Sequence, residues 1–322
     1  MITFSFYGTS HGEGYRGVIN GLPDGFTFEV DCINEQLRLR KTGIGRSSRQ
    51  VYADEVVFDG FDKQVTVNGE LRFFVANKSV EQRADITAVR SGHSDVVGQA
   101  RHPNMTARDL AELSSARNSV CYVVLGAICK QYLHTLGVET YHQIEKIGGF
   151  SSRKRIAEAI EQAKQKGDSL GGIVAVGAKG VPMGLGEILP YTERLDAQIA
   201  ANIMGIPSVK GISFGIGDKF ARISGVEAHD ELRIDNSKIA YATNKCGGIV
   251  SGISNGCDIL FHVTVKPVPT VKGVTTIDTC TLEQVPQHYE RADTCVVDNV
   301  GVIAENILAY VLTNQIIKQQ QN

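Results

Sequence analysis

The sequence predicts an α+β protein made of two β-rich halves, each of which ends in a long apolar helix. Short runs rich in β-branched and aromatic residues are separated by Gly and turn dipeptides throughout the chain. Four longer stretches instead have apolar residues at helical spacing. The parallel between the halves predicts an internally pseudo-symmetric sandwich. Because no linker or low-complexity segment interrupts the chain, we expect a single domain over residues 1–322.

Apolar periodicity and end signals indicate where the helices lie. The first begins at Thr106, where Asp109 has the spacing of a capping partner, and extends to about Leu136. The other three are expected at 152–165, 192–205 and 302–318. The last has an apolar face broad enough to predict a buried C-terminal helix. Strands are expected at 3–7, 16–20, 55–59, 64–77, 172–178, 247–254 and 258–266.

Charge and cysteine content narrow the class of protein. The formal net charge is -2, from 33 basic and 35 acidic residues, which supplies no overall field for nucleic acid or an anionic membrane. The seven cysteines are odd in number and form no CxxC pair, as is typical of reduced cytosolic thiols. The N-terminus has no signal-peptide pattern, and no run of ~18 apolar residues occurs. We therefore expect a cytoplasmic protein that is neither secreted nor membrane-spanning.

One glycine motif resembles a dinucleotide fingerprint but lacks its context. Gly12, Gly14 and Gly17 fit G-x-G-x-x-G after an apolar strand, yet the chain continues as VINGLPDG, a strand followed by turns. A dinucleotide fold needs a helix to open at these glycines, so we reject it. Zinc spacings, HExxH, P-loop and G-x-S-x-G motifs are also absent from the sequence.

Arginines and two histidines carry the visible chemistry. His11 follows a strand in TSHGEG, where it is either a general acid or a loop histidine without function. The segment LRLRKTGIGRSSR is either a phosphate- or carboxylate-binding loop or a solvated basic face, and its interleaved glycines and serines favour anion binding. His93 lies in VRSGHSD between Arg90 and Asp95, and is alternatively a turn histidine paired with Asp95.

Nine ordered blocks resemble the chorismate synthase family along nearly the whole chain. They are FYGTSHGEGYRGVINGLPDGF, RKTGIGRSSR, RSGHSD, SSAR, GLGE with RLDA, IPSVKGISFGIGD, GGIVSGISNG, VKPVPT and ERADTCVVDNVGVIAEN. The resemblance implies a β-α-β sandwich with antiparallel sheets and long central helices, assembled as a homotetramer. It also implies the conversion of 5-enolpyruvylshikimate 3-phosphate to chorismate and phosphate with reduced FMN, for which NADPH is a possible reductant.

The same resemblance implies roles for individual residues. His11 and His93 match the two catalytic histidines, and Asp293 matches the aspartate that assists proton removal. The arginines that match those holding the phosphate and carboxylates of the substrate are Arg40, Arg46, Arg49, Arg90, Arg117 and Arg291. The positions that match flavin contacts are Ser114, Ser115, Pro207, Ser208, Gly252, Lys266, Pro267, Val268, Pro269, Thr270 and Arg291. No metal site is expected.

Several positions depart from the family pattern. Leu113 stands where the family has an arginine before the two serines, and Thr9 stands where it has glutamate. The segment 64–77 replaces a block of different character. These departures leave two alternatives to a chorismate synthase: a diverged flavin-dependent paralogue acting on another phosphorylated anion, or a non-catalytic protein that binds FMN or an anion.

Overall fold

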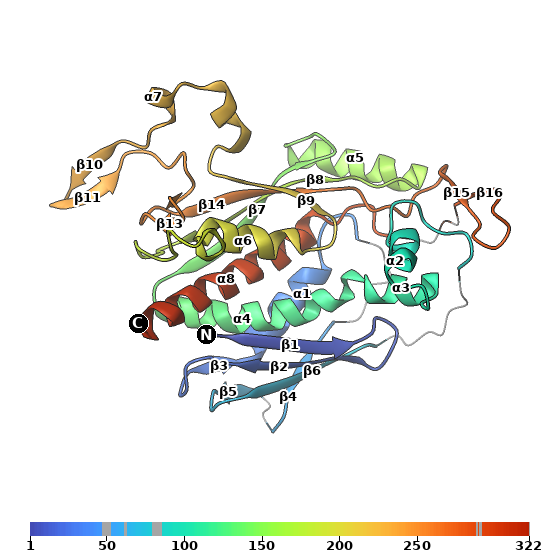
Figure 1. Cartoon of the computed structure of the whole chain (residues 1–322), viewed down its shortest axis with the longest axis horizontal. Coiled ribbons are helices and arrows are strands. Elements are labelled where there is room, and N and C mark those ends of the chain that lie inside the picture. Colours follow the sequence, from blue (N-terminus) through green and yellow to red (C-terminus); the bar gives the residue numbers. More distant parts are fainter. Residues whose placement is uncertain (47–52, 61–62, 79–85, 288, 290–291, 322) are drawn as a thin grey trace.

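A computed structural model describes residues 1–46, 53–60, 63–78, 86–287, 289 and 292–321. Figure 1 shows two antiparallel sheets with long helices between them. The first sheet has the order β1-β2-β6-β4, from β1 (Thr3–Gly8), β2 (Gly14–Asn20), β6 (Leu71–Ala76) and β4 (Val56–Phe58). Side chains alternate on β6, where Leu71, Phe73 and Val75 are buried against the helices.

The second sheet repeats this plan in the other half of the chain. Its order is β7-β8-β14-β9, from β7 (Glu139–Ile147), β8 (Gly172–Lys179), β14 (Ile259–Val265) and β9 (Val209–Phe214). All its pairs are antiparallel. Two four-stranded antiparallel sheets on either side of a shared helical layer give the pseudo-symmetric β-α-β sandwich that we expected (Figure 1).

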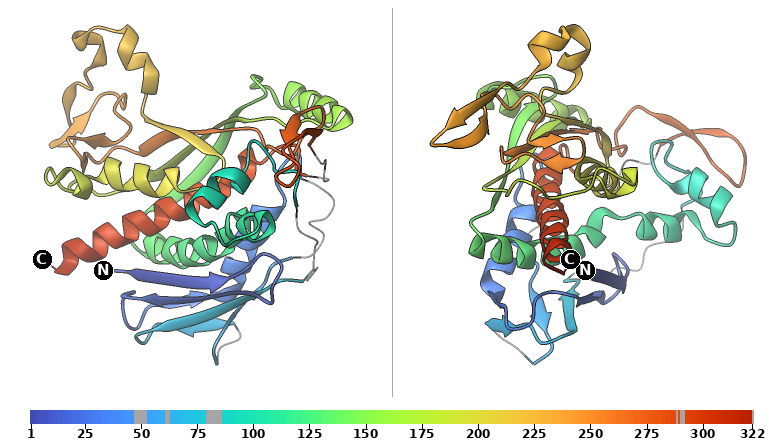
Figure 2. Two further views of the ribbon diagram at one scale, coloured as in Figure 1. Left: turned by 45° about the vertical axis from the view of Figure 1, so that its right-hand side comes forward. Right: turned by 60° about the vertical axis from the view of Figure 1, so that its left-hand side comes forward.

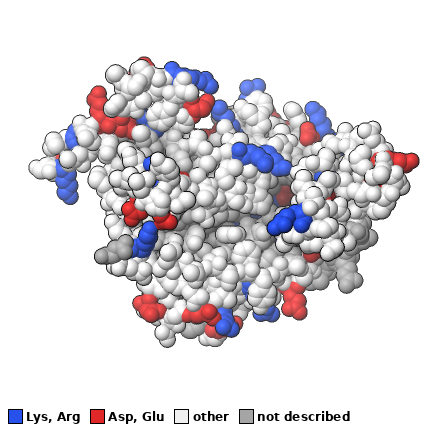
Figure 3. Space-filling model, viewed as in Figure 1, with Lys and Arg blue, Asp and Glu red and all other residues white. Residues whose placement is uncertain are grey.

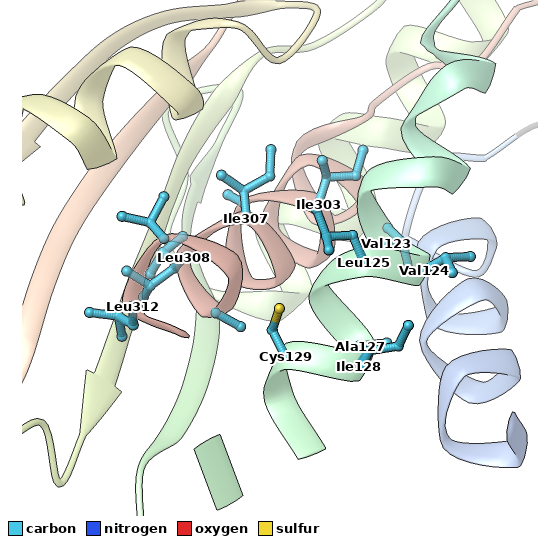
Figure 4. Close-up of a cluster of buried hydrophobic side chains, with 14 of the residues drawn as sticks. Val123, Val124, Leu125, Ala127, Ile128, Cys129, Ile303, Ile307, Leu308 and Leu312 are labelled. Atoms are coloured by element: carbon cyan, nitrogen blue, oxygen red, sulfur yellow. The ribbon is translucent and has the colours of Figure 1, made fainter. Parts of the chain in front are cut away.

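The helical layer supplies most of the core. It contains α1 (Val30–Lys41), α4 (Ser119–Thr135), α6 (Leu195–Met204) and α8 (Val297–Gln321). Figure 4 shows Leu125 and Cys129 of α4 on the side that faces α8, with Leu125 beside Ile303. Gly126 permits the close approach of these helices, since an added Cβ would lie 2.3 Å from the backbone oxygen of Asn306.

Shorter elements surround the two sheets. Figure 2 shows residues 217–241, which we call the arm, projecting from the second sheet. The helical ones are α2 (Asp95–Arg101), α3 (Ala107–Leu113), η1 (Ala116–Asn118), α5 (Arg153–Lys166), η2 (Tyr191–Glu193), η3 (Gly217–Arg222) and α7 (Gly225–Ala228). The strands are β3 (Thr27–Glu29), β5 (Gln64–Thr66), β10 (Leu232–Asp235), β11 (Lys238–Tyr241), β12 (Ile249–Val250), β13 (Ile253–Ser254), β15 (Thr275–Ile277) and β16 (Gln284–Pro286).

The expected single helix from Thr106 to Leu136 is wrong. The Thr106–Asp109 capping box does start α3, but this helix ends at Leu113, and η1 separates it from α4. Ser114 closes α3, and Ser115 is extended and accepts from the backbone N–H of Arg117 at 3.3 Å. The two serines satisfy backbone groups that an uninterrupted helix would pair internally, so they make the break.

The basic segment that we interpreted as a loop begins inside a helix. Arg40 and Lys41 belong to the last turn of α1, whose buried side chains include Val30, Ile33 and Leu37. Basic residues are favourable there because the carbonyl end of a helix carries partial negative charge. The expected strands at 64–77 and 247–254 are each two strands, β5 with β6 and β12 with β13.

A buried polar network joins the helical layer to the second sheet. Glu305 of α8 lies 2.5 Å from Nδ1 of His142 on β7 and also binds Lys130 of α4. Asp298 lies 3.7 Å from Nε2 of the same histidine. Burial alone would lower the pKa of His142, but the two carboxylates outweigh it and raise that pKa to about 9.

The C-terminal helix α8 is long and apolar enough, by length and composition, to cross a membrane. However, 89% of its most apolar window is buried inside the protein. It packs against α4, α1 and the second sheet, which is the position of a core helix. The expected buried C-terminal helix is confirmed, and it begins five residues earlier than we predicted, at Val297.

Candidate active site

A buried carboxylate organises two of the predicted arginines. Asp54, just before β4, accepts hydrogen bonds from Arg40 at 2.7 Å and from Arg117 at 2.6 Å, and Lys41 lies 3.4 Å away. Asp54 is 3% exposed and Arg40 is 6% exposed. Burial alone would raise the pKa of Asp54, but the guanidinium groups lower it below its usual value. Burial lowers the pKa of Arg40 to about 10, so it stays charged at neutral pH.

Arg117 also holds the turn that carries the first histidine. Its Nε donates to Oδ1 of Asn77 at 2.9 Å. The amide nitrogen of Asn77 in turn donates to the carbonyl oxygens of Thr9 and Gly12, each at 2.9 Å. His11 lies between those two carbonyls in the chain, so the arginine cluster and the histidine turn form one connected unit.

His11 has a carboxylate partner from a distant helix. Its Nδ1 lies 3.1 Å from Oε1 of Glu112 on α3 and 3.0 Å from the hydroxyl oxygen of Ser10. Both side chains are partly exposed, at 27% for His11 and 24% for Glu112. The two residues are 101 positions apart in the sequence, and nothing in the local pattern around Glu112 predicts this contact.

His93 lies in a denser arrangement. Its Nδ1 is 3.0 Å from Oδ1 of Asp95, 3.2 Å from Nη2 of Arg90 and 3.1 Å from the hydroxyl oxygen of Ser94. Asp95 is fully buried and also accepts from the backbone and side chain of Arg90. Although burial opposes this, the bonds from His93 and Arg90 hold the pKa of Asp95 far below its ordinary value. The pairing of His93 with Asp95, which the sequence offered as the alternative for this histidine, is therefore present.

The last predicted catalytic residue, Asp293, pairs with the fourth described arginine of the predicted set. Asp293 accepts from Nη1 of Arg46 at 2.6 Å. The backbone around Arg46 is fixed because the carbonyl of Gly45 accepts from the N–H of Thr294 at 2.9 Å. Burial lowers the pKa of Arg46, and its Nε is buried without a hydrogen-bond partner among the described residues. Arg49 and Arg291 lie outside the described residues.

The predicted flavin segments meet beside His93, with one exception. The N–H of Lys266 donates to the carbonyl of Ser208 at 2.8 Å, and its Nζ donates to the carbonyl of Gly92 at 3.0 Å. A Cβ added to Gly92 would lie 2.6 Å from Pro269, so the His93 turn packs directly on the segment 266–270. Ser114 joins the same region, since its hydroxyl lies 2.7 Å from that of Ser94.

Gly252 is the exception. It lies in the turn between β12 and β13, and its carbonyl accepts from the N–H of Leu195 at the start of α6. Pro207 follows the other end of α6, about 15 Å away for a ten-residue helix. Within one chain, the structure therefore does not bring Gly252 to the other predicted flavin contacts.

One cavity lies beside the arginine cluster, and a second, more open hollow lies elsewhere. A cavity of about 250 Å³ is lined by Ser119, Pro207 and side chains of α4, α6 and α8. Ser119 is bonded to Arg40 at 3.1 Å, so this cavity connects the arginine cluster with a predicted flavin segment. A more open hollow of about 450 Å³ is lined by Tyr191, Arg194 and Phe214, away from both histidines. Figure 3, which has the same view as Figure 1, shows basic side chains on the rim of a depression near the middle of the molecule.

The glycines of the rejected dinucleotide motif have a packing role. Gly14 and Gly17 lie in β2, directly after the turn from β1. An added Cβ on Gly17 would lie 2.2 Å from the ring of Phe73 on the neighbouring strand β6. Gly17 thus makes room for an aromatic side chain rather than opening a helix, which confirms that the motif is not a dinucleotide fingerprint.

Known proteins share this architecture and sequence. The sequence profile of the family described as chorismate synthase matches residues 2–317. Chorismate synthase from Thermoanaerobacter pseudethanolicus is 34% identical over 321 residues, which cover 97% of this chain and 92% of that protein. Chorismate synthase from Caldanaerobacter subterraneus subsp. tengcongensis is 32% identical over 321 residues with the same coverage. Chorismate synthase 2 from Bacillus thuringiensis is 32% identical in an alignment that covers 97% of this chain and 93% of that protein.

A solved structure has the same fold. The crystal structure of a chorismate synthase superimposes with a TM-score of 0.80 and covers 99% of this chain and 92% of its own, at 24% sequence identity. This structural comparison shows the fold, and the relatives above show the similarity in sequence. Because the profile match spans nearly all residues and the relatives exceed 30% identity, this chain belongs to the chorismate synthase family.

Proposed function

We propose that this protein is a chorismate synthase, a lyase that eliminates phosphate from 5-enolpyruvylshikimate 3-phosphate in an anti-1,4 sense. The product, chorismate, feeds aromatic amino acid biosynthesis. The observation that carries the proposal is that His11, His93, Arg40, Arg90 and Arg117, distant in sequence, belong to one connected set of contacts inside a chain of this family. Family membership implies a requirement for a reduced flavin.

The residues fit an anionic substrate. The proposed substrate carries a phosphate and two carboxylates, and Arg40, Arg46, Arg90 and Arg117 each retain N–H donors beyond those used internally. Buried or partly buried carboxylates hold these guanidinium groups in fixed positions, so little side-chain freedom is lost when an anion binds. Arg49 and Arg291, which lie outside the described residues, complete the proposed set.

The residues also fit a flavin mononucleotide. Ser114, Ser115 and Lys266 offer polar groups beside the backbone of Ser208 and the segment 267–270. Leu113, which is 60% exposed, offers an apolar side chain to the ring system where the family pattern has arginine. When bound, the reduced flavin supplies transient electron density to the substrate. NADPH is the proposed source of that reduction.

The elimination requires one C–O bond to phosphate and one C–H bond to break while a new double bond forms. We assign proton donation to the departing phosphate oxygen to His11, whose turn is joined through Asn77 to Arg117, an arginine that can stabilise the developing charge. His93 and Asp293 are assigned to proton transfer at the flavin side, since the predicted flavin segments meet beside His93 and Asp293 is oriented by Arg46. These residue roles are proton transfers by positioned side chains, and the electron density that C–O cleavage also needs would come from the bound reduced flavin.

The decisive test mixes the purified protein anaerobically with chemically reduced FMN and 5-enolpyruvylshikimate 3-phosphate. Coupled appearance of phosphate and chorismate absorbance is the expected result. If neither product appears while FMN still binds, the diverged paralogue becomes the better candidate, because the replacement at Leu113 changes the flavin environment. FMN or anion binding without turnover of any shikimate-type phosphate would instead identify a non-catalytic binding protein.

Substitution of either histidine by alanine tests the assigned roles. His11→Ala and His93→Ala should each lower the turnover number ~100-fold or more, which is the usual size of a general acid-base contribution. Unfolding midpoints should remain near that of the wild type, since both side chains are partly exposed. Wild-type turnover in both variants would remove the catalytic assignment.

We further propose a cytoplasmic homotetramer without nucleic-acid or membrane partners. The arm supports assembly because several large apolar side chains on it are exposed, namely Val226, Leu232, Ile234 and Ile239. Sedimentation equilibrium of the full chain would measure the mass directly. A monomer at micromolar concentration would contradict the assembly without affecting the assignment of the fold.

A further inference from the structure

We propose that Glu112 is the positioning residue of His11, forming a carboxylate-histidine dyad that fixes which imidazole nitrogen carries the proton. This inference rests on the catalytic role proposed for His11. The carboxylate of Glu112 lies 3.1 Å from Nδ1, within hydrogen-bond reach of that nitrogen. Glu112 is the last residue but one of α3, so a helix rather than a loop holds its side chain.

The contact determines the tautomer. A carboxylate ionised at neutral pH only accepts hydrogen bonds, so Nδ1 must donate its proton toward Glu112. The hydroxyl of Ser10, 3.0 Å from the same nitrogen, can either accept or donate and does not oppose this arrangement. Nε2 is then the nitrogen left to exchange a proton with a bound ligand. His11 therefore presents one defined nitrogen for chemistry.

The second histidine has a different environment. Nδ1 of His93 faces both the acceptor Asp95 and the donor Arg90, so the carboxylate alone does not determine its tautomer. Asp95 is fully buried and is shared with the guanidinium group, whereas Glu112 is 24% exposed. A dedicated carboxylate that remains accessible to solvent distinguishes the dyad of His11 from the cluster around His93.

Helix α3 couples the two histidines mechanically. Near its C-terminal end Glu112 contacts His11, and directly after that end Ser114 binds Ser94, the neighbour of His93. The Thr106–Asp109 capping box fixes the other end of the helix. A single short helix thus sets the positions of both proposed proton-transfer groups, which explains why a residue from this helix has the positioning role.

The test combines a tautomer measurement with kinetics on the full chain. Nitrogen NMR of ¹⁵N-histidine-labelled, flavin-free protein reports which ring nitrogen is protonated, and the His11 signals are assigned by their loss in His11→Gln. We expect Nδ1–H in the wild type. Glu112→Gln keeps an accepting oxygen and should keep Nδ1–H, whereas Glu112→Ala should populate Nε2–H. The matched control is Glu13→Gln, two positions from His11 with a side chain that is 89% exposed, and it should resemble the wild type.

Kinetics with reduced FMN should follow the same order. Glu112→Ala should lower kcat about 10- to 100-fold, the usual cost of losing a residue that orients a functional histidine through its second ring nitrogen. The KM for the substrate should change little. Glu112→Gln should lie between this variant and the wild type. A wild-type tautomer in Glu112→Ala would overturn the proposal, whether or not kcat fell. Should the wild type make no chorismate, the proposed function fails, while the NMR result still decides the dyad.

Discussion

Replacing Asp54 by alanine tests whether one carboxylate holds the arginine cluster together. Asp54 is 3% exposed and neutralises Arg40, which is 6% exposed, through a bond of 2.7 Å. Removing one partner of a buried ion pair leaves the other charge uncompensated and costs about 3–5 kcal/mol. Arg117 and Lys41 lose the same partner, but both side chains are more exposed and should add less. The loss is a large share of the roughly 5–15 kcal/mol that stabilises a folded protein.

Urea unfolding followed by circular dichroism measures this loss. We expect the midpoint of Asp54→Ala to fall by roughly 1 M or more, from the expected free energy and the usual denaturant slope. Because the pKa of Asp54 is lowered in the folded state, its contribution is complete above its unfolded value and is lost as pH falls through the folded value. The difference between wild type and variant should therefore be full at neutral pH and shrink in strong acid.

An added anion gives the result that separates this reasoning from a general packing defect. The variant retains two guanidinium groups without a carboxylate, so inorganic phosphate should raise its unfolding midpoint more than that of the wild type. Asp59→Asn, at an exposed position in the turn after β4, is the matched control and should stay within about 0.5 kcal/mol. An alanine variant as stable as the wild type, or one indifferent to phosphate, would refute the proposed role of Asp54.

Three further perturbations test other parts of the molecule. The pKa of His142 is raised to about 9 from 6.5, so its imidazolium stabilises the fold fully below pH 6.5. Up to about 3 kcal/mol should be lost as pH rises through 9, and His142→Gln should flatten this profile in urea unfolding. Gly126→Ala places a Cβ 2.3 Å from the backbone oxygen of Asn306, which should cost about 1–3 kcal/mol, while Gly225→Ala meets no atom within 4 Å and serves as its control. Leu113→Arg restores the family residue at a 60% exposed site and should tighten FMN binding measured by fluorescence quenching, whereas unchanged affinity would mean that this position does not face the flavin.

Short sequence patterns predicted those helix ends that are determined by neighbouring residues in the chain. The capping box at Thr106 and the C-terminal glycine of α5, Gly167, are visible as short sequence signals, and both are present. Helix α1 also had a local signal, the spacing of Val30, Ile33 and Leu37, but the glycines that follow its basic turn directed the interpretation toward a loop. The break after Leu113 depends on two serine hydroxyls, whose choice of backbone partner is not visible from periodicity.

Local patterns indicated the two histidines and the basic segment of the candidate site, and the family resemblance supplied their roles, but neither predicted the carboxylates Asp54 and Glu112. Asp54 meets Arg117 across 63 positions, and Glu112 meets His11 across 101. Contacts of this kind join α3 and η1 to the turn after β1 and to the residue Asp54 before β4, segments that lie too far apart in the chain for a local sequence pattern to relate them. The carboxylates Asp54 and Glu112, which orient an arginine pair and a histidine, are therefore the residues that sequence reasoning missed here, whereas Asp95 is only two positions from His93 and Asp293 was supplied by the resemblance.

The charges of the described site residues indicate how it would recognise an anion. Each described arginine of the site has a carboxylate partner: Asp54 for Arg40 and Arg117, Asp95 for Arg90, and Asp293 for Arg46. Four guanidinium groups against three carboxylates leave an excess of only one positive charge among them. A bound anion would then be held mainly by directed N–H donors at fixed positions rather than by a strong net field. Because directed, partly buried hydrogen bonds are screened less by salt than exposed charges are, the KM for the substrate should rise only modestly with ionic strength.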